Sequence, residues 1–138
     1  MGGNCERCPE TATLVDGIEA AHAAGLVYFS RLTPGAHIAP HCGPTNARLR
    51  CHLGLEVPPG ARLRVGADHR AWQEGRCLVF EDSFEHEVWN DADRPRLVLI
   101  LDVWHPDLSD AERWALTEVR RFSPGARSYW RRVRRSAR

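Results

Sequence analysis

The sequence predicts a mainly β fold, a sandwich or jelly-roll barrel, with one helix before the strands and another after them. Short runs rich in β-branched, aromatic and leucine residues follow one another from residue 26 to residue 103, and Pro, Gly, Asn and Asp separate them. Many short strands at close spacing are typical of sandwiches and barrels. The 138 residues contain no internal repeat or linker, so we expect one domain, 1–138, with a core at about 26–114.

The first expected element is a helix over Thr11–Ala24. Apolar residues recur there at helical spacing, and Gly25 is a natural stop. From Leu26 onward the character of the sequence changes to β, because the runs are short and turn-forming residues bound them. The expected strands are 26–32, 48–55, 62–65, 77–80, 84–89 and 96–103.

The end of the chain combines a helix with a basic tail. His105-Pro106 ends the last strand, and Ser109 with Glu112 has the spacing of a capping box that opens a helix through about Phe122. The tail 124–138 then carries six arginines beside Tyr129 and Trp130. Such a tail could contact nucleic acid or an anionic surface. A solvated terminus is the simpler interpretation, and we expect it here.

Composition narrows the possible function classes. The formal net charge is only +1, which argues against a domain whose whole surface binds polyanions. No run is apolar for long enough to span a bilayer, and the first residues have no hydrophobic stretch of a secretory signal. The five cysteines are an odd number, so we expect a reducing cytoplasm. Cys5 and Cys8 form a CxxC, but no second close pair follows, so a structural zinc is not predicted. The region also lacks the strand–helix setting of a redox pair.

The 48–55 strand is the first segment that carries chemistry. Alternation places Arg48, Arg50 and His52 on one face, while leucines and Cys51 occupy the other. If the leucine face packs against protein, the polar face looks either onto solvent or into a polar cavity. Two arginines and a histidine that face inward need anions to offset their desolvation.

Three further residues support a site. His41 lies in a Pro/Gly-rich turn, and His86 lies between two apolar neighbours on one face of the 84–89 strand. Taken alone, each is more typical of a hydrogen-bonded structural histidine. Arg96, however, begins an otherwise apolar strand and needs a bound carboxylate or a side-chain partner. Together these residues suggest a metal that binds a small dicarboxylate.

Two long segments carry a family resemblance. HCGPTNARLRCHLGL and then FEDSFEHEVWNDADRPRLVLILDVWHP resemble the catalytic domain of the aspartyl/asparaginyl β-hydroxylase family. The resemblance runs from about Ser30 to Trp114. It implies a double-stranded β-helix, a jelly-roll relative that is cupin-like. It also implies the cofactors Fe(II), 2-oxoglutarate and O2.

The resemblance also implies roles for individual residues. It assigns iron to His41 and His86, and it places Arg96 with Ser30 on the distal carboxylate of 2-oxoglutarate. The remaining site residues have roles at the other end of the co-substrate and at the substrate. His52 and Arg50 bind there, Arg48 receives the acidic group of the substrate, and Asp82 is an acid that holds iron-bound water.

The expected iron site departs from the usual triad of two histidines and one carboxylate. The position two residues after His41 is Gly43, which offers no ligand. The family shares this gap and still hydroxylates, although related oxygenases use it to bind a halide. Halogenation therefore stays an alternative. A cupin-like metal-dependent binding or isomerase module and a pseudoenzyme that acts as an interaction domain are two others.

The expected substrate is small. Only about 25 residues precede the first strand, whereas the best-known family members carry a large helical region there. We therefore expect an aspartyl or asparaginyl unit in a short peptide, a carrier-bound amino acid or a small acidic metabolite. The expected partners are 2-oxoglutarate and this acidic or peptidyl substrate, with neither a membrane nor a nucleic acid.

Overall fold

The computed structural model describes residues 2–18 and 25–122. Its helices are α1 (Gly2–Arg7), α2 (Pro9–Asp16) and α4 (Asp110–Phe122). Its strands are β1 (Val27–Leu32), β2 (His37–His41), β3 (Arg48–Glu56), β4 (Ala61–Val65), β5 (Asp68–Arg70), β6 (Cys77–Phe80), β7 (His86–Asn90) and β8 (Arg96–Trp104). The contacts divide the chain into a unit that ends at His105, with all these strands, and a unit that begins at Pro106, with α4.

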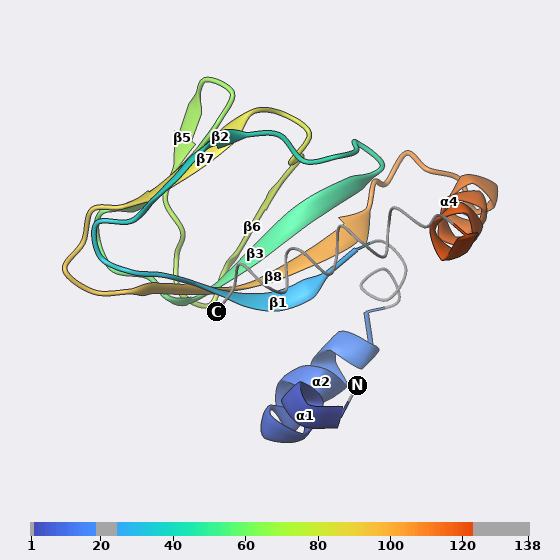
Figure 1. The fold of residues 1–138 in the computed structure, drawn as a ribbon, viewed down its shortest axis with the longest axis horizontal. Coiled ribbons are helices and arrows are strands. Elements are labelled where there is room, and N and C mark those ends of the chain that lie inside the picture. Colours follow the sequence, from blue (N-terminus) through green and yellow to red (C-terminus); the bar gives the residue numbers. More distant parts are fainter. Residues whose placement is uncertain (1, 19–24, 123–138) are drawn as a thin grey trace. The chain divides into compact units, whose positions relative to one another are not determined.

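The strands of the described part form two four-stranded antiparallel sheets. The first has the order β1-β8-β3-β6 and the second the order β2-β7-β4-β5, so every neighbour in the first sheet is distant along the chain. Figure 1 shows the two sheets as facing layers. This is the architecture of a jelly roll, or double-stranded β-helix, and the predicted fold class is confirmed.

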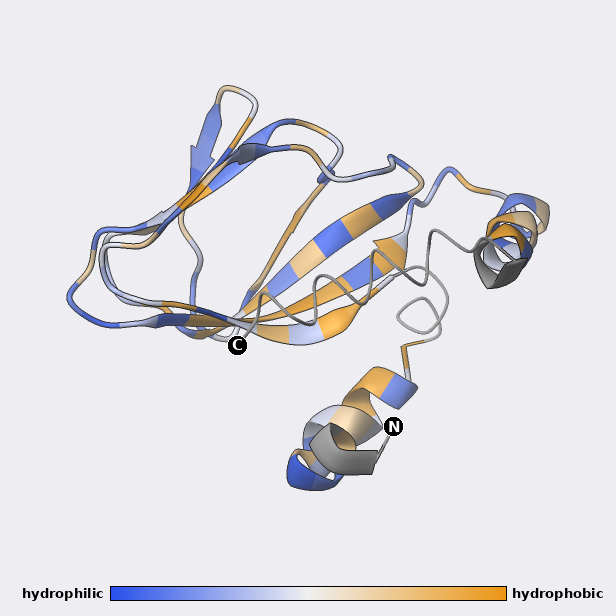
Figure 2. Cartoon of the chain, in the orientation of Figure 1, coloured by the Kyte–Doolittle hydropathy of each residue, from blue (hydrophilic) through white to orange (hydrophobic). Residues whose placement is uncertain are grey.

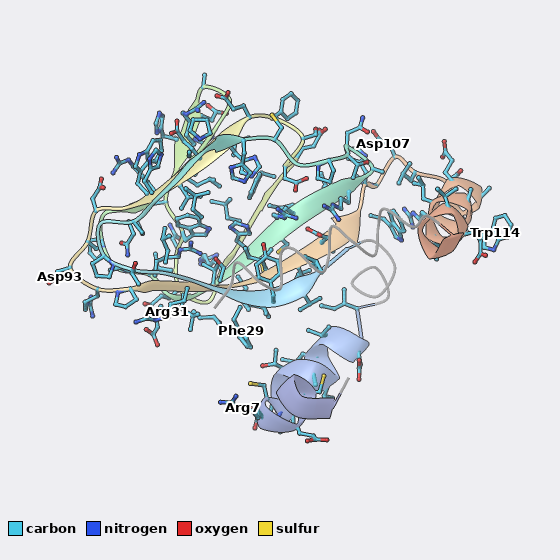
Figure 3. The ribbon with its side chains drawn as sticks, in the orientation of Figure 1. Arg7, Phe29, Arg31, Asp93, Asp107 and Trp114 are labelled. Atoms are coloured by element: carbon cyan, nitrogen blue, oxygen red, sulfur yellow. The ribbon has the colours of Figure 1, made fainter. Side chains whose placement is uncertain are left out.

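The alternation predicted for β3 is confirmed. Figure 2 shows hydrophilic and hydrophobic residues alternating along this strand. Arg48 and His52 on one face are buried, and Cys51 on the other face is buried as well. The outer face of the same sheet also carries exposed apolar side chains. Figure 3 shows Phe29 of β1, which is 47% exposed, and Arg31 pointing away from the second sheet.

An apolar core occupies part of the space between the sheets. Its buried members come from both sheets and from the β5–β6 connection: Leu32, Ala61, Leu63, Trp72, Val88, Val98 and Ile100. Leu63 and Val98 are fully buried, and truncating Leu63 to Ala should cost about 2–5 kcal/mol of stability. This core holds the two sheets at a fixed separation, which positions the polar side chains on the same inner faces.

The structure corrects several expected boundaries. The helix expected over Thr11–Ala24 instead begins at Pro9 and ends at Asp16, and 19–24 lie outside the described residues. The strand expected at 84–89 begins only at His86. Strands β2 and β5 and helix α1 were not expected. His41 is therefore the last residue of a strand and not part of a turn, because backbone pairing with β7 extends the HIAPH segment.

The expectations for the C-terminal part have mixed outcomes. Strand β8 ends at Trp104, directly before His105-Pro106, and the Ser109 hydroxyl and backbone N–H both donate to the Glu112 carboxylate at the start of α4. Both expected features are thus confirmed. The basic tail 124–138 lies outside the described residues. Among the helices that are described, none has the length and apolar character needed to cross a membrane.

Candidate functional site

His41 and His86 lie side by side at one end of the second sheet. The last residue of β2 pairs with the first residue of β7, which brings the two imidazole centroids to 4.1 Å. The Nδ1 atom of His41 lies 2.9 Å from the carbonyl oxygen of Ala39, and the Nδ1 atom of His86 lies 2.9 Å from that of Phe84. A carbonyl oxygen only accepts, so each Nδ1 carries the proton and donates it. Each neutral ring therefore keeps a lone pair on Nε2.

This arrangement fits a transition-metal ion. Imidazole nitrogens suit iron and zinc, and a ligating histidine usually donates its other ring N–H to a backbone carbonyl or a carboxylate. Burial lowers the pKa of His86 and the adjacent His41 lowers it further, although the hydrogen bond to Phe84 opposes both. The neutral form is the one that binds a metal.

Among the described residues, no third protein ligand accompanies the two histidines. Over residues 2–18 and 25–122, no cluster of three or more His, Cys, Asp or Glu side chains could hold a metal ion. His37, the other histidine of β2, is used elsewhere: its Nε2 lies 3.0 Å from Glu87, and its ring stacks on Trp89. The described residues therefore add no third ligand to His41 and His86, and their role as metal ligands stays a prediction.

Asp82 lies next to the position where a third ligand would be expected. Its side chain is fully buried. The backbone N–H of Gly43 donates to the backbone carbonyl oxygen of Asp82 at 2.6 Å. A Cβ built on Gly43 would collide with the Asp82 carboxylate, so only glycine fits at this position without a shift of Asp82. The carboxylate therefore fills the space that a side chain at position 43 would need.

Arg50 links two buried aspartates. Its Nη1 lies 3.0 Å from Asp82 Oδ2, and its Nε donates to Asp102 Oδ1 at 3.0 Å. Burial disfavours the charged form, but Asp102 and Asp82 outweigh that effect and raise the pKa of Arg50. Asp102 also contacts Arg48, whose Nη1 lies 3.1 Å from Oδ2. The sequence predicted inward-facing arginines that need anions, and two aspartates supply them.

Asp102 also anchors the start of β1. Its Oδ2 accepts the backbone N–H of Leu26 at 3.1 Å, and a Cβ on Gly25 would overlap its carboxylate. Gly25 was expected to end a helix. In the structure its missing side chain allows the backbone to approach Asp102.

Arg96 differs from Arg48 and Arg50 in its partners. It is 1% exposed, and no carboxylate of the described residues lies within ion-pair distance of it. Its Nη1 donates to the backbone oxygen and the hydroxyl of Ser30, each at a long 3.4 Å, and its Nε has no partner among the described residues. Burial lowers its pKa to about 10. A bound anion would offset the cost of burying a cation with incomplete hydrogen bonding.

His52 connects Arg96 with the histidine pair. The Trp72 indole N–H donates to its Nδ1 at 3.2 Å, so the neutral ring has its proton on Nε2. That Nε2 is buried and has no partner among the described residues. Burial lowers the pKa of His52 to about 3, with contributions from Arg96, Arg50 and His86. Phe80 packs edge-on against His52 at 5.1 Å and against His86 at 5.4 Å.

Of the predicted residues, Ser30, Arg48, Arg50, His52, His86 and Arg96 lie on strands of the two sheets, His41 is exposed at the end of β2, and Asp82 lies in the β6–β7 connection. The structure adds two residues that the sequence interpretation missed. Asp102 was not singled out, although an aspartate within the apolar run LVLILDVW is a detectable signal. Trp72 lies in the connection between β5 and β6, where no periodicity marks it. Its contact with His52 depends on tertiary packing alone.

Comparisons with known proteins assign a family. The family model for aspartyl/asparaginyl beta-hydroxylase matches residues 1–106. Aspartate beta-hydroxylase domain-containing protein 1 of Mus musculus is 47% identical over 127 residues, which cover 88% of this chain and 35% of that protein. Aspartyl/asparaginyl beta-hydroxylase of Homo sapiens is 44% identical over 118 residues, 83% of this chain and 16% of that protein. The chain thus spans about a third or less of the length of these two relatives.

A solved structure supports the fold. The crystal structure of a predicted oxalate decarboxylase from Thermotoga maritima matches with a TM-score of 0.51 at 13% identity, over 61% of this chain and 70% of that one. At this identity the likeness concerns the fold alone. The family model and the relatives match most of the sequence, and the matched part of this chain includes His41, His86 and Arg96. The chain belongs to the aspartyl/asparaginyl β-hydroxylase family.

Proposed function

We propose that this chain is an Fe(II)- and 2-oxoglutarate-dependent hydroxylase. The observation that carries the proposal is Arg96, a buried cation without a carboxylate partner among the described residues, in a site that also holds two metal-competent histidines. A co-substrate with a free carboxylate could pair with Arg96 at one end. Its other end could coordinate a metal held by His41 and His86. Relatives named as β-hydroxylases support the reaction class.

Each residue has a definite task in this proposal. His41 and His86 would hold iron through Nε2, and Arg96 with Ser30 would hold the distal carboxylate of 2-oxoglutarate. The Nε2–H of His52 would donate to an oxygen of the same co-substrate, because it is a buried donor with no other partner in the described part. When bound, the iron and its co-substrate would activate O2 for hydroxylation, with succinate and CO2 as the by-products.

Asp82 favours hydroxylation over halogenation. Its carboxylate fills the space against Gly43, and Arg50 holds it there. An anion beside that place repels a halide but accepts hydrogen bonds from water. We therefore infer that Asp82 orients water next to the two histidines.

Arg48 supports a proposal for the substrate class. Its side chain is buried on the inner face of β3, and Asp102 contacts one edge of its guanidinium. We propose that a carboxylate or amide of the substrate binds Arg48, as in an aspartyl or asparaginyl unit of a short peptide, a carrier-bound amino acid or a small acidic metabolite. Bidentate pairing would place the carbon next to that group for oxidation.

The test is turnover of 2-oxoglutarate by the purified chain with Fe(II) and O2. Free Asp, free Asn and short peptides that contain them are offered, and succinate and hydroxylated product are both measured. We expect succinate with each accepted substrate and one added oxygen atom in the product. A chain that loads iron and releases no succinate, with or without these substrates, would overturn the proposal.

A further inference from the structure

Trp72 contacts two site residues with two different parts of its indole ring. It is 4% exposed and lies between β5 and β6. Its Nε1–H donates to Nδ1 of His52 on β3, and its ring face lies against Arg96 on β8, with 4.8 Å from the guanidinium carbon to the ring centroid. A single side chain therefore supports both groups that face the anion site.

The hydrogen bond fixes the tautomer of His52. An indole nitrogen can only donate, so Nδ1 of His52 must be the acceptor and carry no proton. The two rings are nearly parallel, with an interplanar angle of 15° and centroids 5.9 Å apart. Neutral His52 consequently holds its proton on Nε2, and this N–H points to a buried place without a partner among the described residues.

The ring face constrains Arg96. A guanidinium that lies within about 6 Å of an indole centroid is attracted by the ring, and the attraction is stronger where water is excluded. Arg96 has no carboxylate partner in the described part, and its contacts with Ser30 are long. Trp72 is therefore a main constraint on where this cation lies before a ligand binds.

We propose that Trp72 is a positioning residue that prepares His52 and Arg96 as two fixed donors for one anionic ligand. This inference rests on the proposed function in taking 2-oxoglutarate as that ligand. Preset donors lose less conformational entropy on binding, so Trp72 contributes to affinity without contacting the ligand itself. A tryptophan that served only as core would contribute to stability and leave both donors unaffected.

The first measurement needs neither metal nor ligand. In the metal-free chain with ¹⁵N-labelled histidine, a two-bond ¹H–¹⁵N correlation spectrum distinguishes the Nε2–H tautomer from the Nδ1–H tautomer. The His52 signals are identified by their loss in His52→Gln. We expect only the Nε2–H form in the unmodified chain and a mixture in Trp72→Phe, which keeps a ring but lacks the donor. An Nδ1–H form in the unmodified chain would overturn the inference, even if Trp72→Phe failed to fold.

The second measurement is the affinity of the anaerobic Fe(II)-loaded chain for 2-oxoglutarate. Loss of the hydrogen bond in Trp72→Phe should weaken binding by up to about tenfold. Trp72→Leu also removes the ring face and should weaken binding further, while Fe(II) affinity stays unchanged in both. Trp89→Phe is the matched control, because Trp89 stacks on His37 and contacts Arg62 away from the site.

The outcomes separate the two hypotheses. If Trp72→Phe keeps the unmodified tautomer and binds 2-oxoglutarate as tightly as the parent chain, Trp72 is only a core residue. If the parent chain does not bind 2-oxoglutarate at all, the proposed function fails, and the tautomer spectra still decide whether Trp72 presets His52.

Discussion

The carboxylate of Asp82 occupies the space that a side chain at position 43 would fill, and Gly43 is the residue that permits it. The usual third iron ligand of related oxygenases would come from this position. Position 43 offers no ligand, and the space beside it is filled by the carboxylate of Asp82, which lies in the β6–β7 connection.

Gly43→Asp should not restore a three-ligand site. The new Cβ would collide with the Asp82 carboxylate, and two acids in one buried space would repel each other. We expect lower stability and lower Fe(II) affinity than in the parent chain, measured by chemical unfolding and metal titration. Gly43→Asp combined with Asp82→Ala relieves the clash and should recover part of the loss. Tighter iron binding by the single variant would contradict this interpretation.

His41→Ala and His86→Ala should each abolish Fe(II) binding and 2-oxoglutarate turnover. With two imidazoles as the protein ligands, neither residue has a substitute in the described part of the chain. His37→Ala is the control, because His37 lies on the same strand but contacts Glu87 and Trp89. Metal content after dialysis is the direct measurement. Loss of iron in His37→Ala alone would mean that the wrong histidine of β2 had been assigned.

Arg96→Ala should raise the KM for 2-oxoglutarate by at least about tenfold and leave iron affinity nearly intact. Removing one partner of a buried charge pair costs roughly 2–5 kcal/mol of binding. Arg31→Ala is a suitable control, since Arg31 lies on β1 next to Ser30 but is exposed on the outer side of the sheet. An unchanged KM in Arg96→Ala would show that another cation anchors the co-substrate.

Arg48→Ala should uncouple the reaction. Succinate would still form while hydroxylated product falls, because the substrate would no longer be held in register with the site. The ratio of product to succinate is the measurement, and added chloride provides a second one, since we expect no chlorinated product. Equal coupling in Arg48→Ala and the parent chain would remove Arg48 from the substrate site.

The buried His52 should make stability depend on pH. Its pKa is about 3 in the folded chain and 6.5 in the unfolded one, so the unfolded state binds the extra proton between these values. Stability from this residue is complete above pH 6.5 and falls by about 1.4 kcal/mol per pH unit as pH drops toward 3. Unfolding of the metal-free chain at pH 7 and pH 5 should show this loss, and His52→Gln should show less of it. Equal losses in both would contradict the assignment.

Much of the architecture was predictable from local pattern. Alternation placed Arg48, Arg50 and His52 on one face of β3, and the structure buries that face. Strand β2 was missed because His37–His41 contains a proline and is exposed throughout, which resembles a turn. It is an edge strand, where a proline is tolerated, and only its pairing with β7 defines it.

The site was harder to predict than the fold for a physical reason. The resemblance identified residues by type, but their partners come from distant segments. Arg50 meets Asp102, and His52 meets Trp72, across gaps in sequence that no local pattern spans. The iron, the co-substrate, the substrate and the cytoplasmic location stay predictions until they are measured.

The quartet of Arg48, Arg50, Asp82 and Asp102 has an evolutionary consequence. Its two positive and two negative charges balance inside the protein, so any single neutral replacement leaves one buried charge without compensation. Substitutions at these positions should therefore persist in descendants of this chain only in pairs that keep the sum at zero. Arg50 donates two hydrogen bonds to Asp102, so these two residues should be the pair that changes together most often.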